Sequence, residues 1–134
     1  MACKTLFFDF RKEEKHFFEV NKTDNLDIKF FVWSLNSETV KNLAQEDFDS
    51  AVMISVYKTS EINKEILSRF KNLRLIAVRC EDYSNIDVGY CFNNNIALIN
   101  VECFEDPHSA EYILKTAFYA MSDFLCGGKS NRVV

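Results

Sequence analysis

The chain has 134 residues, of which 48% are hydrophobic and 27% are charged, so it is long enough to form one globular domain with a substantial core. The formal net charge is −4 and the sequence contains no run of Lys or Arg, which argues against nucleic acid as a direct ligand. No apolar stretch approaches the roughly 20 residues of a membrane-spanning helix and no signal peptide is recognisable, so we expect a cytoplasmic protein that does not bind membranes.

Five stretches rich in apolar and β-branched residues predict strands, at residues 4–10, 27–35, 50–57, 74–79 and 96–101. The third of these is apolar over nearly its whole length. A continuous apolar run is typical of a strand that is buried on both faces of a parallel sheet.

Segments with helical spacing lie between the strands. Residues 13–22 form the first of them. In residues 38–45, Val40, Leu43 and Ala44 share one face, and residues 61–70 have a similar apolar stripe. Either Thr59 or Ser60 is a suitable N-cap for the helix over residues 61–70.

Two more helices are predicted towards the C-terminus. Ser84 followed by Asp87 resembles a capping box for a short helix that ends at Phe92. The last helix has Asp106 as its cap and Gly127 as its stop. Because strands alternate with helices, we predict one α/β domain over residues 1–134. Its fold is a flavodoxin-like three-layer sandwich with a five-stranded parallel sheet, order 2-1-3-4-5, and helices on both faces. Such folds place their working residues at the carboxyl ends of the strands.

The five cysteines show neither a CxxC motif nor a cluster with histidine; they are Cys3, Cys80, Cys91, Cys103 and Cys126. Their odd number favours reduced, buried thiols in the cytoplasm over a metal site or a redox switch. We therefore predict no metal site and no cofactor.

Two segments resemble a known family. The first is residues 79–87, Arg-Cys-Glu-Asp-Tyr-Ser-Asn-Ile-Asp, and the second is residues 94–104, Asn-Asn-Ile-Ala-Leu-Ile-Asn-Val-Glu-Cys-Phe, followed by Ser-Ala-Glu-Tyr at residues 109–112. Both are similar to motifs of the D-isomer-specific 2-hydroxyacid dehydrogenases, in particular the D-lactate dehydrogenase branch. The resemblance implies the substrate-binding domain of that family. The 134 residues contain no GxGxxG motif, so we expect neither a nucleotide-binding domain nor bound NAD in them, and no catalytic residues.

The same segments depart from the family pattern where the substrate would bind. The resemblance implies that backbone amides of the loop after the fourth strand hold the substrate carboxylate, and a small residue and a Gly are expected where this chain has Glu81 and Asp82. Phe104 stands in place of a substrate-contacting Tyr. We expect that this former substrate loop no longer serves a 2-oxo acid; its residues are Arg79, Cys80, Glu81, Asp82, Tyr83 and Phe104.

Two surfaces are candidates for binding. An acidic crest at the carboxyl edge of the sheet could receive a basic partner or a divalent cation, or be only a solvated rim; it consists of Asp9, Glu81, Asp82, Glu102, Glu105 and Asp106. The last helix has apolar residues on more than one face, which indicates an interface for self-association or a partner, unless these residues cover the sheet edge. The residues in question are Tyr112, Phe118, Tyr119, Met121, Phe124 and Leu125.

Three functions follow as hypotheses. The preferred one is a pseudoenzyme: a non-catalytic, dehydrogenase-derived module that binds and regulates or inhibits a protein partner, with a phage or mobile-element anti-defence or anti-CRISPR inhibitor as a narrower form. The second is a substrate-domain fragment of a D-2-hydroxyacid dehydrogenase that needs an NAD-binding domain. The third is a small-molecule sensor with an altered ligand.

Overall fold

The computed structural model describes residues 3–10, 26–79 and 83–100 of the chain. The helix predicted at residues 13–22 and the last predicted helix lie outside this part. No helix in the described ranges is both long and apolar enough to cross a membrane.

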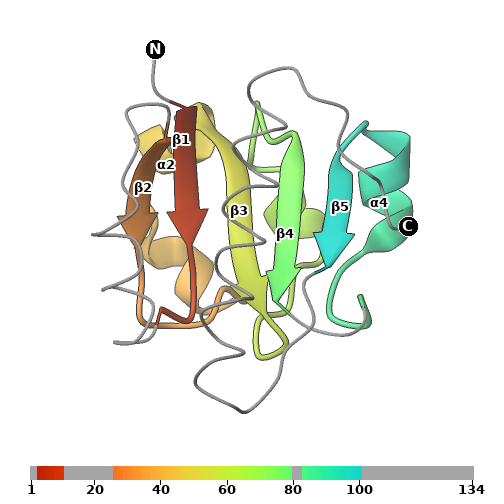
Figure 1. Cartoon of the computed structure of the whole chain (residues 1–134), viewed down its shortest axis with the longest axis horizontal. Coiled ribbons are helices and arrows are strands. Elements are labelled where there is room, and N and C mark those ends of the chain that lie inside the picture. The colour runs from red at the N-terminus through yellow and green to blue at the C-terminus, as the bar shows by residue number, and fades with distance from the viewer. Residues whose placement is uncertain (1–2, 11–25, 80–82, 101–134) are drawn as a thin grey trace.

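All described strands belong to one parallel sheet, shown in Figure 1. The spatial order is β2-β1-β3-β4-β5, which confirms the order predicted from the sequence. The strands are β1 (Cys3–Phe7), β2 (Leu26–Phe30), β3 (Ala51–Tyr57), β4 (Leu75–Arg79) and β5 (Ala97–Asn100).

Strand β3 is the centre of the sheet because it pairs with β1 on one side and β4 on the other. Met53 and Ile54 point to opposite faces, and both are fully buried. The central position of β3, buried on both faces of the sheet, therefore explains the continuous apolar run in its sequence.

The described helices lie along one face of the sheet (Figure 1); they are η1 (Thr39–Asn42), α2 (Gln45–Ser50), α3 (Lys64–Leu67) and α4 (Val88–Asn93). This face carries the larger core, in which Phe8, Ile54 and Leu67 are fully buried. The opposite face carries a second cluster that includes Phe7 and Leu75. Helices on both faces stay a prediction, because the two other predicted helices lie outside the described residues.

The prediction of one helix over residues 38–45 is wrong. The chain forms the short 3₁₀ helix η1, then has extended backbone at Leu43 and Ala44, and begins α2 at Gln45. The carboxylate of Asp47 accepts the Ala44 N–H at 3.0 Å, and this bond starts a new helix at a position that the apolar spacing does not reveal. Val40 and Leu43 are buried as expected, but Ala44 is exposed.

The other two described helices begin later than predicted. Neither Thr59 nor Ser60 caps α3, because Asn63 does so by accepting the Ile66 N–H at 3.0 Å. Likewise, the capping box at Ser84 is wrong: Asp87 is the N-cap of α4.

The first two strands are shorter than predicted. Asp9 has a φ of 56°, and this left-handed backbone ends the regular pairing of β1. The segment after β2 still bonds to the chain after β1, since Phe31 donates to the Phe7 carbonyl and Asp9 donates to the Trp33 carbonyl. These bonds no longer form a regular ladder, so residues 31–35 are not strand.

A buried carboxylate joins α2 to the neighbouring strands β1 and β2. Asp47 lies 3.2 Å from the ammonium of Lys4 on β1 and 3.2 Å from that of Lys29 on β2, and its side chain is only 2% exposed. Burial acts to raise the pKa of Asp47, but the Ala44 N–H and the two ammonium groups outweigh it and hold the pKa below its ordinary value. Asp47 is therefore charged at neutral pH and compensated by two cations.

We expect Asp47→Ala to lower the free energy of unfolding by about 3 kcal/mol at pH 7, because it removes the common partner of both lysines. Because the pKa is lower in the folded state, this stabilisation is present above the unfolded pKa of about 3.9 and is lost as the pH falls through the folded pKa. Urea unfolding should therefore show the difference between wild type and variant shrinking below about pH 4. Asp49→Ala is the control, because this carboxylate contacts the exposed side chains of Lys71 and Gln45 and should matter little. An equal effect of both substitutions would contradict the role given to Asp47.

Candidate functional site at the carboxyl edge of the sheet

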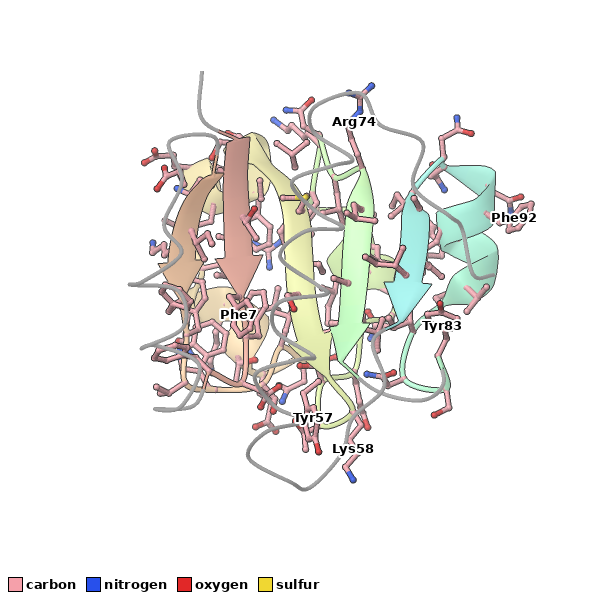
Figure 2. The ribbon with its side chains drawn as sticks, viewed as in Figure 1. Phe7, Tyr57, Lys58, Arg74, Tyr83 and Phe92 are labelled. Atoms are coloured by element: carbon pink, nitrogen blue, oxygen red, sulfur yellow. The ribbon has the colours of Figure 1, made fainter. Side chains whose placement is uncertain are left out.

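The carboxyl ends of the strands meet at one edge of the sheet, where the sequence placed the working residues. Figure 2 shows Tyr57 and Lys58 at this edge, just where β3 ends, and Tyr83 near the tip of β5. Two described polar groups occupy the edge: one around Asp9 and one around Asn85.

Asp9 is held by hydroxyl groups from two other segments. Ser34 donates to one carboxylate oxygen at 2.5 Å and Ser60 donates to the other at 3.1 Å. Ser34 also lies 2.9 Å from the Thr59 hydroxyl, and the buried Ser60 hydroxyl accepts the Leu35 N–H at 2.9 Å. The chain thus ties the ends of β1, β2 and β3 together through one carboxylate.

Asn85 fixes the loop after β4 to the end of β3. Its side-chain amide donates to the carbonyls of Tyr57, at 3.1 Å, and Ser60, at 2.8 Å. The backbone carbonyl of Asn85 accepts the Ile62 N–H, and the backbone carbonyl of Ile62 accepts the Asp87 N–H. We call this set of bonds between residues 83–87 and 57–62 the loop clamp.

The clamp leads directly into α4. The Asp87 carboxylate accepts the Tyr90 N–H at 3.0 Å and so begins the helix. The thiol of Cys91, one turn on, is buried, and burial together with the nearby Asp87 charge raises its pKa to about 11. The thiol is protonated at neutral pH. Its burial confirms the prediction of a buried thiol for Cys91, and the other four cysteines stay predictions.

Two polar atoms of the loop have no hydrogen-bond partner among the described residues. They are the Tyr83 hydroxyl and the Asn85 amide oxygen, and both are buried. Burial also raises the pKa of Tyr83, so the phenol stays neutral at physiological pH. Tyr83 can act only as a neutral hydrogen-bonding group.

Most of the predicted site residues fall outside the described part, so their placement stays a prediction. Of the acidic crest only Asp9 is described, and of the former substrate loop only Tyr83 and the backbone of Arg79. The undescribed ones are Cys80, Glu81, Asp82, Glu102, Phe104, Glu105, Asp106 and the interface residues Tyr112, Phe118, Tyr119, Met121, Phe124 and Leu125. The described ranges contain no group of three or more His, Cys, Asp or Glu side chains that could hold a metal ion.

Sequence reasoning missed some of the residues that build this edge. Ser34 and Ser60 carry no signal, because an isolated serine in a loop is common in any protein. Asn85 and Asp87 were visible in the Asn-Ile-Asp motif of the family resemblance, and the structure gives that motif its physical role in the loop clamp.

With its five-stranded parallel sheet of order β2-β1-β3-β4-β5, the chain resembles the substrate-binding domain of a D-2-hydroxyacid dehydrogenase. The family model described as "D-isomer specific 2-hydroxyacid dehydrogenase, catalytic domain" matches residues 5–130, so the chain belongs to this family. A "2-hydroxyacid dehydrogenase homolog" of Zymomonas mobilis is 30% identical over 80 residues, covering 58% of this chain and 24% of the relative.

Solved structures agree on the fold. D-lactate dehydrogenase from Aquifex aeolicus, complexed with NAD and lactic acid, is 21% identical with a TM-score of 0.63, covering 89% of this chain and 33% of that one. A D-lactate dehydrogenase from Treponema pallidum is 14% identical with a TM-score of 0.62, covering 98% of this chain and 41% of that one. The chain therefore spans a quarter to two fifths of the length of these relatives.

We expect Asn85→Ala to lower the free energy of unfolding by about 1–3 kcal/mol, because two carbonyls lose a shared donor. The expected local sign is faster amide hydrogen exchange at Ile62 and Asp87, measured by NMR. Asn94→Ala is the matched control, since its amide donates to the Tyr90 carbonyl at an exposed position. If Asn94→Ala accelerated exchange at Ile62 as much as Asn85→Ala, the clamp would not depend on Asn85.

Proposed function

We propose that the chain is a dehydrogenase-derived binding module whose former substrate loop no longer accepts a 2-oxo acid, and which acts without redox turnover of its own. The observation that carries this proposal is a contrast within one loop. The residues that anchor it match the family, whereas the two residues expected to face the substrate are carboxylic acids.

The anchoring half of the loop is intact. Asn85 and Asp87 make the bonds of the loop clamp, and Ile86 is buried and bridges to Ile62. Glu81 and Asp82 come only four and three residues before Asn85. We infer that the loop is attached as in the family, while its charge at residues 81 and 82 differs from the family pattern.

Electrostatics make the changed loop unfavourable for an anion. A carboxylate at about 4 Å from another repels it by roughly 1 kcal/mol in water and by several times more where water is excluded. Glu81 and Asp82 would add two such terms where the family resemblance implies a bound substrate carboxylate. We infer that pyruvate and related 2-oxo acids are rejected.

The Asp9 group supports a scaffold that needs no ligand. Both oxygens of this carboxylate accept hydrogen bonds from serine hydroxyls of the same chain. Hydrogen bonds of this kind compensate a partly buried carboxylate without a bound cation. The edge of the sheet is thereby stable in the free protein.

A protein partner is the ligand class that we propose in place of a small molecule. A net charge of −4 suits a basic partner surface. Inhibition of that partner, including an anti-defence role, would be one form of such binding. None of the contacts described above supports or opposes it. Purification of the tagged chain from its native host should recover a partner in near-stoichiometric amount, and recovery of the chain without one would count against this part.

A second candidate is favoured by the family match over residues 5–130. In this case the chain supplies the substrate-binding half of an enzyme whose NAD-binding half is encoded elsewhere or further along. Coding sequence after Val134 that continues in frame into a GxGxxG motif would favour this candidate over the first.

We expect the purified chain to show no NADH oxidation above background with pyruvate or oxaloacetate, and no thermal shift with pyruvate or oxamate. The double variant Glu81→Ala with Asp82→Gly removes both charges and restores the expected backbone freedom, so it should gain a measurable shift with oxamate. Glu38→Ala with Glu65→Ala removes the same charge at two exposed sites and should gain none. Turnover by the wild-type chain would overturn the proposal.

A further inference from the structure

Strand β2 forms one border of the sheet and is paired only with β1 in the described part of the chain (Figure 1). Phe31 donates its N–H to the Phe7 carbonyl and its own carbonyl accepts the Phe10 N–H, so the backbone of Phe31 points towards β1. Successive residues of a strand direct their backbone groups to alternate sides. The backbone N–H and C=O groups of Lys29 and Asp27 therefore point towards β1 as well. The backbone groups of Ile28, between them, point outwards.

The outward edge has a symmetric charge pattern. Asp27 and Lys29 flank Ile28, carry opposite charges and are both exposed. In an antiparallel pair related by a two-fold axis at Ile28, each Asp27 lies opposite Lys29 of the other strand. The two Ile28 residues would then exchange two N–H···O=C bonds, which makes them the hydrogen-bonded pair of the ladder.

The positions on either side of a hydrogen-bonded pair are the non-hydrogen-bonded ones, where side chains come closest, at a Cα separation of about 4.5 Å. Asp27 and Lys29 occupy those positions in this register. Opposite charges placed directly across an antiparallel pair stabilise it, whereas like charges oppose it.

Charges on an edge strand usually discourage pairing. That protection works when the facing charges are alike, as with a row of lysines. Here the order Asp27-Ile28-Lys29 is complementary to itself in the antiparallel direction and repulsive in neither pair. The edge therefore selects one register and one direction instead of excluding all of them.

Lys29 remains available although it already contacts Asp47. Its ammonium lies 3.2 Å from both oxygens of that carboxylate, yet the side chain is 48% exposed. An ammonium has three donors. Lys29 can therefore lie between Asp47 of its own chain and Asp27 of a second copy.

From this we propose that two copies of the chain pair antiparallel through the outer edges of β2, around a two-fold axis at Ile28, and form one continuous ten-strand sheet. The count is the five described strands of each copy. A single strand pair is a small interface, so the dimer is weak and its population depends on concentration. The proposal is independent of what the carboxyl edge binds.

Ile28→Pro tests the backbone part of the proposal. Proline removes the one N–H that points outwards at the axis and leaves the β1 ladder its donors, as prolines on edge strands do. Sedimentation equilibrium should show a concentration-dependent dimer for wild type and for Ile28→Val, with the dissociation constant raised at least tenfold in Ile28→Pro. Circular dichroism confirms that each variant is folded. A wild type that stays monomeric at millimolar concentration would overturn the proposal.

Asp27→Lys tests the charge part, and cross-linking tests the register. Asp27→Lys puts two ammonium groups opposite each other on each side of the axis and should weaken the dimer, more so at low salt. In a background where Cys3, Cys80, Cys103 and Cys126 are serine, Ile28→Cys should form an intermolecular disulfide, because the two residues face each other at about 5.5 Å between Cα atoms. Asp27→Cys is the matched control and should cross-link far less. Equal cross-linking of both, or a dimer unaffected by Asp27→Lys, would show a different interface.

Discussion

The carbonyl oxygens of Tyr57 and Ser60 meet the same side-chain amide, that of Asn85, and the position of the whole carboxyl edge depends on this contact. Through it the loop after β4 is fixed to the turn after β3. That turn carries Ser60, whose hydroxyl supports both Asp9 and Leu35. One amide thus links four strand ends among the described residues.

This arrangement separates two properties that sequence comparison alone would merge. Family membership is shown by the match over residues 5–130, and within that range Asn85 and Asp87 hold the loop after β4 in place. Substrate binding is a separate property: we propose that Glu81 and Asp82, at positions where the family resemblance implies a small residue and a Gly, make this segment unfavourable for a 2-oxo acid. On this proposal the domain keeps the first property without the second, because residues that anchor a loop and residues that contact a ligand are under different physical constraints.

The sheet order could be predicted because it depends on apolar runs and on the right-handed connection rule, both of which are visible in sequence. The helix boundaries could not, since they are decided by single polar contacts. Asp47 begins α2 by bonding to Ala44, and Asn63 rather than Ser60 caps α3, although both are reasonable caps by residue type. The strand ends indicated the carboxyl edge as the place to look for a site, and this stays a prediction. Ser34 and Ser60 were not found, because their roles exist only once distant segments are side by side.

The left-handed backbone of Asp9 has a consequence for how this chain can diverge. At a φ of 56° most side chains are strained, and glycine, asparagine and aspartate are the residues that adopt the conformation readily. Glycine would lose both serine contacts, and asparagine would keep only one acceptor oxygen. Position 9 is consequently confined to a very small set of amino acids by geometry alone, so homologues that retain aspartate there do not by that fact retain an activity.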